Sequence, residues 1–424
     1  MTSIALRTLD CGLPLIVEPM SGVRSVGLTW FLPAGSATDP DHLEGLAPMW
    51  SELIFRGCGD LDSRAHADAL DRLGASRSAD VSTFHLRFSA TLLGSRLLEA
   101  LPLIVDMVRR PRFDEASVEP VRDLSLQAIE SLADDPQERA ILAARSRHNP
   151  SPLNRSGLGT ERGLRAITRA DLVEGWSRQV RPGAATWGGA VLAIAGAIEG
   201  GMAGVDAIAS TLDPLLRGWS GSPPPITVAD APHRGTYHHV HDDSSQVQIV
   251  LMHESPPEPH PDAILERIVT SVLSGGMAAR LFTEVREKRG LCYSVSASYA
   301  TDRAFGRTLA YVGTTPERAQ TSLEVLCAEL NRINTPEGAV DRAEFDRALT
   351  GIKSSIVFSG ESTGARAAAL ASDYHRLGRP RSLAEIAAAY DAVSLDDVNG
   401  YLARRTLGPT TIVTLGPAAL TPPA

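Results

Sequence analysis

Hydrophobic and polar positions follow two periods along the chain, which predicts a mixture of strands and helices. In the first half, residues 23–32 read as a buried strand, residues 43–55 carry apolar side chains at helical spacing, and residues 76–93 predict two paired strands. The same order of elements returns in the second half. There the pattern predicts strands at 246–252 and 307–312 and helices at 261–273, 316–333 and 342–358.

Two matching helix starts support an internal duplication. Thr168 to Asp171 and Ser394 to Asp397 both place a hydroxyl residue three positions before an aspartate, which is a capping box, and a strand is expected after each helix, at 186–197 and 410–415. Residues 218–235 are rich in Gly, Ser and Pro and read as a linker. We therefore expect two domains, at 1–217 and 236–424. The short turns between strands and the clustered helices predict an α+β fold, in which each domain is an α/β sandwich with an antiparallel or mixed sheet covered by helices.

The most informative stretch runs from Ser271 to Tyr299 and is expected to form a helix followed by a strand. Gly290 supplies a left-handed residue that ends the helix. The helix is expected to turn Leu281, Phe282 and Val285 inward. Strand alternation then predicts that Tyr293, Val295 and Ala297 share one face of the sheet and that Ser294, Ser296 and Ser298 share the other. Arg286 and Tyr293 would thus lie on either side of a helix-to-strand corner.

The run G-G-M-x-x-R-L-F-x-E-V-R-E-K-R-G-L-x-Y-S-V within this stretch resembles the second domain of the M16 (pitrilysin-like, inverzincin) peptidases. The likeness is to their half-length M16B subunits, which work as two-chain clamps. The resemblance implies two tandem domains of the LuxS/metallopeptidase-like sandwich fold. It also implies that Arg286 and Tyr293 hold the substrate backbone at an active site whose zinc lies on the other half of the clamp. By the same resemblance, Gly275 and Gly276 would form a substrate-facing loop.

The zinc-binding motif of this family is degenerate in this chain. The family pattern G-L-A-H-x-x-E-H-x-x-F-x-G aligns without gaps onto residues 45–57. Pro48, Ser51 and Glu52 then occupy the ligand, general-base and ligand positions, and Ala128 occupies the distant third ligand position. A peptidase zinc site needs three protein ligands, so we expect no metal in this chain and zinc in a partner subunit.

A second substrate contact is implied by the resemblance. In active homologues an edge strand of the zinc domain binds the peptide by strand addition. The matching segment here begins at Ala79, Asp80 and Val81. Because the zinc beside it is expected to be missing, this segment could be vestigial.

Two interpretations of Arg286 and Tyr293 compete. In the first, Arg286 belongs to a solvated basic face with Arg280 and Arg289, and Tyr293 is a core aromatic whose hydroxyl is satisfied at the rim. In the second, an Arg fork and a phenol donor reach the carbonyl oxygens of an extended peptide or a developing oxyanion. Residue chemistry alone favours the first, and the family block favours the second.

The leading hypothesis is a non-catalytic subunit of a heterodimeric M16B zinc metallopeptidase. A partner chain bearing H-x-x-E-H would supply zinc and the general base, and this chain would supply Arg286 and Tyr293 to a peptide or unfolded polypeptide. The alternatives have no proteolytic role. One is a scaffold that resembles the core subunits of respiratory complexes. The other is a peptide carrier that resembles the paired proteins of pyrroloquinoline quinone maturation.

Composition narrows the remaining function classes. A net charge of −9 over 424 residues argues against nucleic-acid and polybasic membrane partners. The four cysteines are scattered without C-x-x-C spacing, which favours reduced thiols over a zinc knuckle or disulfides. The N-terminal residues lack a signal-peptide pattern, and no long apolar run occurs, so we expect a cytoplasmic protein.

Overall fold

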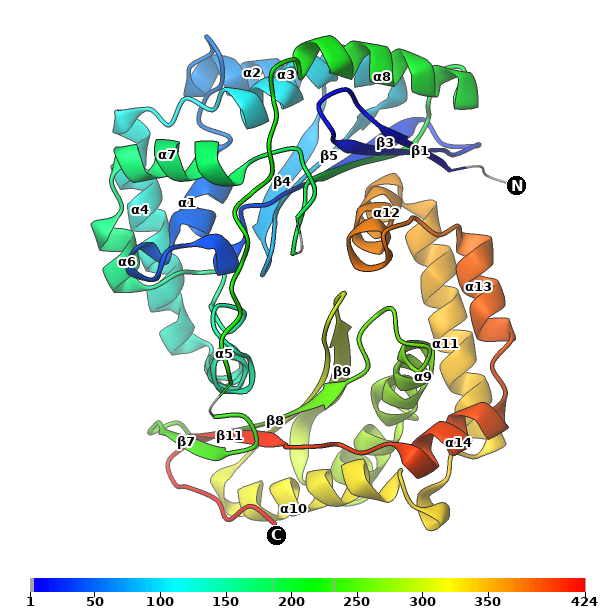
Figure 1. The fold of residues 1–424 in the computed structure, drawn as a ribbon. Coiled ribbons are helices and arrows are strands. Elements are labelled where there is room, and N and C mark those ends of the chain that lie inside the picture. The colour runs from blue at the N-terminus through cyan, green and yellow to red at the C-terminus, as the bar shows by residue number, and fades with distance from the viewer. Residues whose placement is uncertain (1–3, 186, 232, 424) are drawn as a thin grey trace. The chain divides into compact units, whose positions relative to one another are not determined.

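The computed structural model describes residues 4–185, 187–231 and 233–423 and divides the chain into two compact units (Figure 1). Each unit is built on one mixed β-sheet with helices packed on its faces. The α+β class predicted from the hydrophobic pattern is therefore confirmed. Residue 186, where one strand was expected to begin, lies outside the described residues.

The sheet of the first unit has six strands in the order β1-β2-β6-β3-β5-β4. Their bounds are Ala5–Thr8 (β1), Pro14–Pro19 (β2), Ser25–Leu32 (β3), Ser76–Val81 (β4), Leu86–Leu93 (β5) and Val191–Gly196 (β6). Only β2 and β6 run parallel to each other, and all the other pairs are antiparallel. Strand β6 is buried at every position because it lies inside the sheet, with Leu192 and Ile194 in the larger core on one face and Ala193 and Ala195 in a smaller core on the other.

The sheet of the second unit has five strands in the order β7-β11-β8-β10-β9. Their bounds are Tyr237–His241 (β7), Val247–Ser255 (β8), Cys292–Thr301 (β9), Gly306–Thr314 (β10) and Thr411–Gly416 (β11). Strands β7 and β11 are parallel, as β2 and β6 are, and the remaining pairs are antiparallel. Apart from the additional strand β1 at one edge of the first sheet, the two sheets repeat one strand order, which agrees with the internal duplication inferred from the helix starts.

Helices cover the sheets and form the larger core of each unit. The first unit contains Leu46–Leu53 (α1), Ser63–Arg72 (α2), Leu97–Arg109 (α3), Glu115–Glu130 (α4), Glu161–Ala166 (α6), Arg169–Gln179 (α7) and Gly204–Leu215 (α8). The second unit contains Ala263–Ser274 (α9), Pro316–Arg332 (α10), most of Arg342–Glu361 (α11), Leu383–Asp391 (α13) and Leu395–Arg404 (α14). Both predicted capping boxes are present, at the N-termini of α7 and α14.

Two further helices are exchanged between the halves of the sequence. Helix α12 (Thr363–Leu377) follows α11 in the chain but belongs to the first unit, where it packs on β3 and β6 (Figure 1). Helix α5 (Pro136–His148) precedes the linker but belongs to the second unit, where it packs on β8 and β11. Each sheet therefore receives the helix that covers its second face from the other half of the sequence.

This exchange changes the domain limits expected from the sequence. The first unit comprises residues 1–131, 151–229 and 359–382, and the second comprises the segments between and after them. Both exchanged helices bury small apolar cores of their own. Leu370 and Ala371 of α12 pack with Ile16 and Phe31, and Ala140 and Ala144 of α5 pack on the second sheet. A division at the linker misses these contacts because each exchanged helix contacts a sheet that is remote in sequence.

In the part of the chain that the structure describes, no helix is both long enough and apolar enough to span a bilayer.

Candidate functional site

The corner predicted between residues 281 and 293 is a π-helical turn, Phe282–Glu287, that leads into β9. Leu281 and Val285 are fully buried and anchor the turn in the core of the second unit. Gly290 has φ +58°, the left-handed value expected for the residue that ends the helix. A π-turn widens the helix by one residue and often accompanies a functional site, because it reorients the side chains that follow.

Arg286 differs from the basic residues around it in having no carboxylate partner among the described residues. Arg280 is buried against Glu344, and Lys288 and Arg289 both pair with Glu284. The Arg286 guanidinium is exposed and lies 4.9 Å from the centre of the Phe282 ring. The interpretation of these residues as one solvated basic face is therefore wrong for Arg280, which is buried in an ion pair, and Arg286 is exposed with the Phe282 ring beside its guanidinium.

Tyr293 lies on the face of the sheet opposite to the one that strand alternation predicts. The pairing of β9 with β10 shifts by one residue at the junction of Gly313 and Thr314, which is a β-bulge. Val295 and Ala297 pack against the main core of the second unit, as predicted. The extra residue turns the Tyr293 phenol to the other face, where its side chain is 47% exposed.

A cluster of tyrosine and glutamine side chains surrounds the Tyr293 phenol. The Tyr293 hydroxyl donates to Oε1 of Gln246 at 2.5 Å, and the Tyr311 hydroxyl donates to Oε1 of Gln248 at 2.6 Å. Nε2 of Gln248 also donates to Oε1 of Gln246 at 3.3 Å. A Cβ at Gly313 would lie 2.6 Å from the Tyr311 hydroxyl oxygen and 2.7 Å from that of Tyr293, so a larger residue there would displace both phenols. We call these four side chains, of Tyr293, Gln246, Tyr311 and Gln248, the Tyr-Gln cluster.

The sequence did not reveal three members of this cluster. Gln246 and Gln248 flank the start of β8, and Tyr311 lies in β10, so no local motif joins them to Tyr293. Burial raises the pKa of Tyr311, and the neighbouring Tyr293 phenol raises it further, so Tyr311 remains a neutral hydrogen-bond donor. A neutral phenol and two amides can bind the donors and acceptors of a peptide backbone.

Gly275 and Gly276 follow the C-terminus of α9, a helix that packs near β9. A Cβ at Gly275 would lie 2.4 Å from the Ser271 carbonyl oxygen, and Gly276 has φ +155° with open space around it. Met277 beyond them is 74% exposed. The loop is therefore a tight, solvent-facing turn. The substrate contact implied for it stays a prediction.

The positions of the degenerate zinc motif lie on two helices that pack together, α1 and α4. Pro48 and Ser51 are half-buried on α1, and the Ser51 hydroxyl donates to the Pro48 carbonyl at 2.8 Å. Glu52 is exposed on α1, and Ala128 lies in the last turn of α4. In the described ranges, no group of three or more His, Cys, Asp or Glu side chains is arranged to hold a metal ion. The side chains present at these positions do not fit a zinc ion, because only Glu52 could act as a ligand.

Ala79, Asp80 and Val81 lie on β4, the outermost strand of the first sheet. The strand pairs with β5 on one side, and Asp80 forms a cross-strand ion pair with Arg87 at 2.9 Å. An edge strand can accept an added strand because its outer backbone groups are not used within the sheet. The position of this segment suits strand addition. Its use by a substrate stays a prediction.

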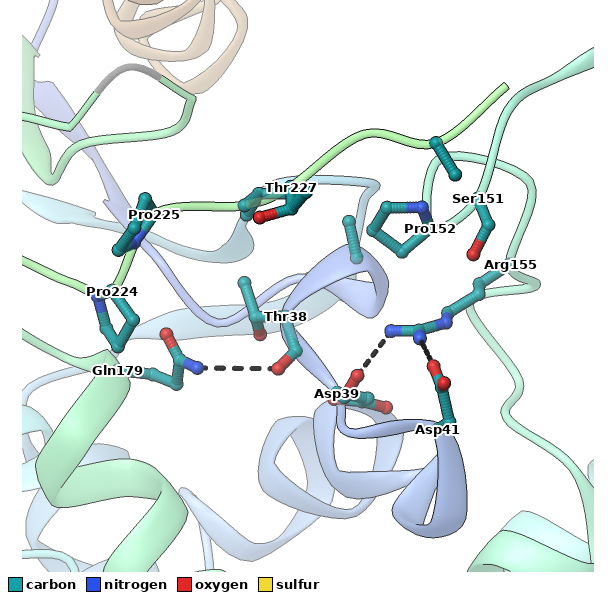
Figure 2. A pocket seen from close by; sticks show the side chains of 13 residues that line it. Thr38, Asp39, Asp41, Ser151, Pro152, Arg155, Gln179, Pro224, Pro225 and Thr227 are labelled. Atoms are coloured by element: carbon teal, nitrogen blue, oxygen red, sulfur yellow. Dashed lines mark hydrogen bonds and ion pairs between the residues drawn. The ribbon is translucent and has the colours of Figure 1, made fainter. Parts of the chain in front are cut away.

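A separate cavity of about 300 Å³ lies in the first unit, between the loop before α1 and the segment 224–229 (Figure 2). Arg155 donates to the Asp39 carbonyl and to the Asp41 carboxylate, and Gln179 donates to the Thr38 carbonyl at 3.4 Å. The Asp39 carboxylate accepts hydrogen bonds from the N–H groups of Gly45 and Ala47 at the start of α1, and burial raises its pKa to about 7. These contacts connect the lining residues to one another. The Asp39 carboxylate, which lines the cavity, stabilises the N-terminus of α1 by accepting hydrogen bonds from its backbone.

Two features define the class of this protein: the duplicated strand order, and the packed helices α1 and α4 that carry the positions of the degenerate zinc motif. The protein is a two-domain chain of the metallopeptidase fold. Residues 18–160 match the family described as "Insulinase (Peptidase family M16)", and residues 189–352 match "Peptidase M16 inactive domain". The chain belongs to peptidase family M16.

Similar proteins agree with this assignment. An "uncharacterized zinc protease" of Mycobacterium tuberculosis is 26% identical over 406 residues, covering 92% of this chain and 88% of the relative. The crystal structure of a peptidase M16 inactive domain from Pseudomonas fluorescens superposes with a TM-score of 0.84 at 20% identity and 99% coverage of both chains. A chain of complex III2 from Candida albicans gives a TM-score of 0.81 at 15% identity, covering 98% of this chain and 96% of that one. The structural likenesses show a shared fold.

Proposed function

We propose that this chain is the non-catalytic subunit of a heterodimeric M16B zinc metallopeptidase. A partner chain bearing H-x-x-E-H would supply the zinc, its ligands and the general base. This chain would supply Arg286 and Tyr293 to the partner's site, and it would bind a peptide or an unfolded segment. Zinc bound in the partner would polarise the scissile carbonyl and activate a water molecule.

The observation that carries this proposal is the exposure of the Arg286 and Tyr293 side chains where the π-helical turn leads into β9. Arg286 is exposed and has no carboxylate partner among the described residues, although the carboxylate of Glu284 in the same turn binds Lys288 and Arg289. Tyr293 is half-exposed and directs its hydroxyl away from the core. A free guanidinium and an accessible phenol can bind peptide carbonyl oxygens and stabilise a developing oxyanion.

The degenerate motif supports a role in trans. Pro48, Ser51 and Ala128 offer no metal-binding side chain, so a hydrolytic site built on α1 and α4 would lack its zinc ligands and its base. The Arg-Tyr corner retains its donors. A subunit that keeps substrate-binding groups and lacks metal ligands needs a second chain to complete a peptidase site.

The test is co-expression of this chain with its candidate zinc-bearing partner and an assay of cleavage of a quenched peptide. Each chain is assayed alone, both are assayed together, and the pair is assayed with Arg286→Ala or Tyr293→Phe. We expect activity only from the pair, with a loss of at least about tenfold in either variant, equivalent to about 1.4 kcal/mol of transition-state stabilisation.

Two matched variants control for charge and packing. Arg289→Ala removes an arginine of the same turn that already has a partner, and Tyr299→Phe removes a phenol of the same strand that donates to the Pro256 carbonyl. Both controls should cleave as the wild type does. A partner that is fully active alone, or Arg286 and Tyr293 variants that match their controls, would refute the proposal and favour the scaffold or the peptide carrier.

A further inference from the structure

Gln246 holds the Tyr293 phenol in the structure without a peptide. The Tyr293 hydroxyl has one proton, and this proton is donated to Oε1 of Gln246 at 2.5 Å. To bind a peptide carbonyl, the phenol must release Gln246. The Gln246 oxygen then becomes available to accept a new donor at the same place.

A backbone amide has the two groups that this exchange needs. Its carbonyl can accept from Tyr293, and a backbone N–H of the same peptide can donate to Oε1 of Gln246. One internal hydrogen bond is replaced by two hydrogen bonds to the peptide, so neither side chain loses a partner. We infer that Gln246 is a further peptide-contacting residue, which works with Tyr293 to recognise a backbone C=O and N–H. This inference rests on the proposed function.

The rest of the Tyr-Gln cluster fixes Gln246 in position for this role. Gln246 is exposed, but Nε2 of Gln248 donates to its Oε1 at 3.3 Å, and Gln248 is 1% exposed. Oε1 of Gln248 in turn accepts from the buried Tyr311 hydroxyl at 2.6 Å. When Tyr293 turns to a peptide, the Gln248 amide still orients the Gln246 carbonyl. A carbonyl oxygen accepts two hydrogen bonds, so the peptide N–H takes the place that Tyr293 vacates.

Position-specific N-methylation distinguishes this contact from general binding. The probe is a fluorescein-labelled extended peptide of Ala, Ser and Lys, together with the set of versions in which each backbone N–H in turn is methylated. Binding to the complex of this chain and its zinc-bearing partner is followed by fluorescence anisotropy, with zinc removed so that no cleavage occurs. At one position N-methylation should weaken binding to the wild type by about tenfold, because the Gln246 oxygen, once covered by the bound peptide, loses the N–H donor that replaces Tyr293.

In Gln246→Ala, the same N-methylated peptide should bind as well as its unmethylated parent, and the sensitivity at all other positions should stay. Tyr293→Phe should weaken the parent peptide and keep the sensitivity to N-methylation. Gln320→Ala, on α10, removes a glutamine that bonds to Glu324 and to the Thr421 backbone, and it should behave as the wild type.

The outcomes separate this inference from the proposed function. If Arg286→Ala and Tyr293→Phe impair cleavage but Gln246→Ala keeps every N-methyl sensitivity, the contact by Gln246 is refuted and the subunit role stands. If the wild-type complex binds none of the peptides, both are refuted. If binding shows the predicted pattern but cleavage needs neither Arg286 nor Tyr293, the Gln246 contact holds in a peptide carrier without a catalytic role.

Discussion

A buried ion pair between Arg366 and Glu18 joins the exchanged helix α12 to the first sheet, and its removal tests how much it contributes to stability. Arg366 lies on α12, Glu18 lies on β2, and their side chains are 1% and 3% exposed. Nε of Arg366 donates to the Glu18 carboxylate, and Nη2 donates to the Arg381 carbonyl at 2.6 Å. In Arg366→Met the carboxylate stays buried without its partner, which should lower the free energy of unfolding by about 3–5 kcal/mol.

Equilibrium unfolding in urea, followed by tryptophan fluorescence, measures this change. The double variant Glu18→Met/Arg366→Met removes both charges and should lose clearly less stability than Arg366→Met alone, because no uncompensated charge remains. Arg376→Met, on the same helix and only partly buried, is the matched control and should change stability by about 0.5 kcal/mol or less. If Arg366→Met lowers the free energy of unfolding no more than Arg376→Met does, the ion pair does not hold α12 on β2. The same follows if the double variant is less stable than Arg366→Met alone.

Two further predictions concern the first unit. The folded-state pKa of Asp39 is raised from 3.8 to about 7, so the folded chain keeps a proton that the unfolded chain releases, and the free energy of unfolding should fall by up to about 4 kcal/mol between pH 4 and pH 7. Asp39→Asn should remove this part of the slope in urea midpoints measured across that range, and an unchanged slope would contradict the assignment. Restoring the motif with Pro48→His, Ser51→Glu, Glu52→His and Ala128→Glu should give a chain that retains about one zinc ion through gel filtration, measured by mass spectrometry of the metal. The same variant without Ala128→Glu should retain less, and no difference between the two would show that α4 is not placed to supply a ligand.

Local features of this fold can be predicted from the sequence because their causes lie within a few residues. The capping boxes at Thr168 and Ser394 form as expected, since each hydroxyl and the aspartate three positions later bond to each other's backbone N–H groups. Gly290 takes the left-handed conformation that ends a helix. The repeated order of strands and helices along the chain also follows from the repeated pattern of hydrophobic runs.

Helix α12 could not be placed from the sequence, although its own pattern was readable. Ala367, Leu370, Ala371 and Tyr374 follow helical spacing and form its buried or partly buried face, and that spacing would have indicated the helix. Nothing within residues 363–377 indicates which sheet the face covers. The residues that the helix contacts, Ile16, Phe31 and Glu18, are remote in sequence. Contacts of this range depend on the assembled fold, so an exchanged helix is assigned to the wrong half by any division at the linker.

The position of Tyr293 could not be predicted from the sequence either, because it depends on a β-bulge of one residue in β9. Strand alternation counts positions from Val295 and Ala297 and places Tyr293 with them on the core face. The bulge opposite Gly313 and Thr314 adds one residue to β9, and the count fails at Tyr293, the position in this strand that is proposed to bind substrate. Without the bulge the phenol would face the buried core and could reach neither Gln246 nor a peptide. With the bulge, and with glycine at 313 to leave room for two hydroxyls, Tyr293 reaches the exposed face and meets Gln246. The proposed peptide contact therefore depends on an irregularity in the strand, and regular periodicity alone would have excluded it.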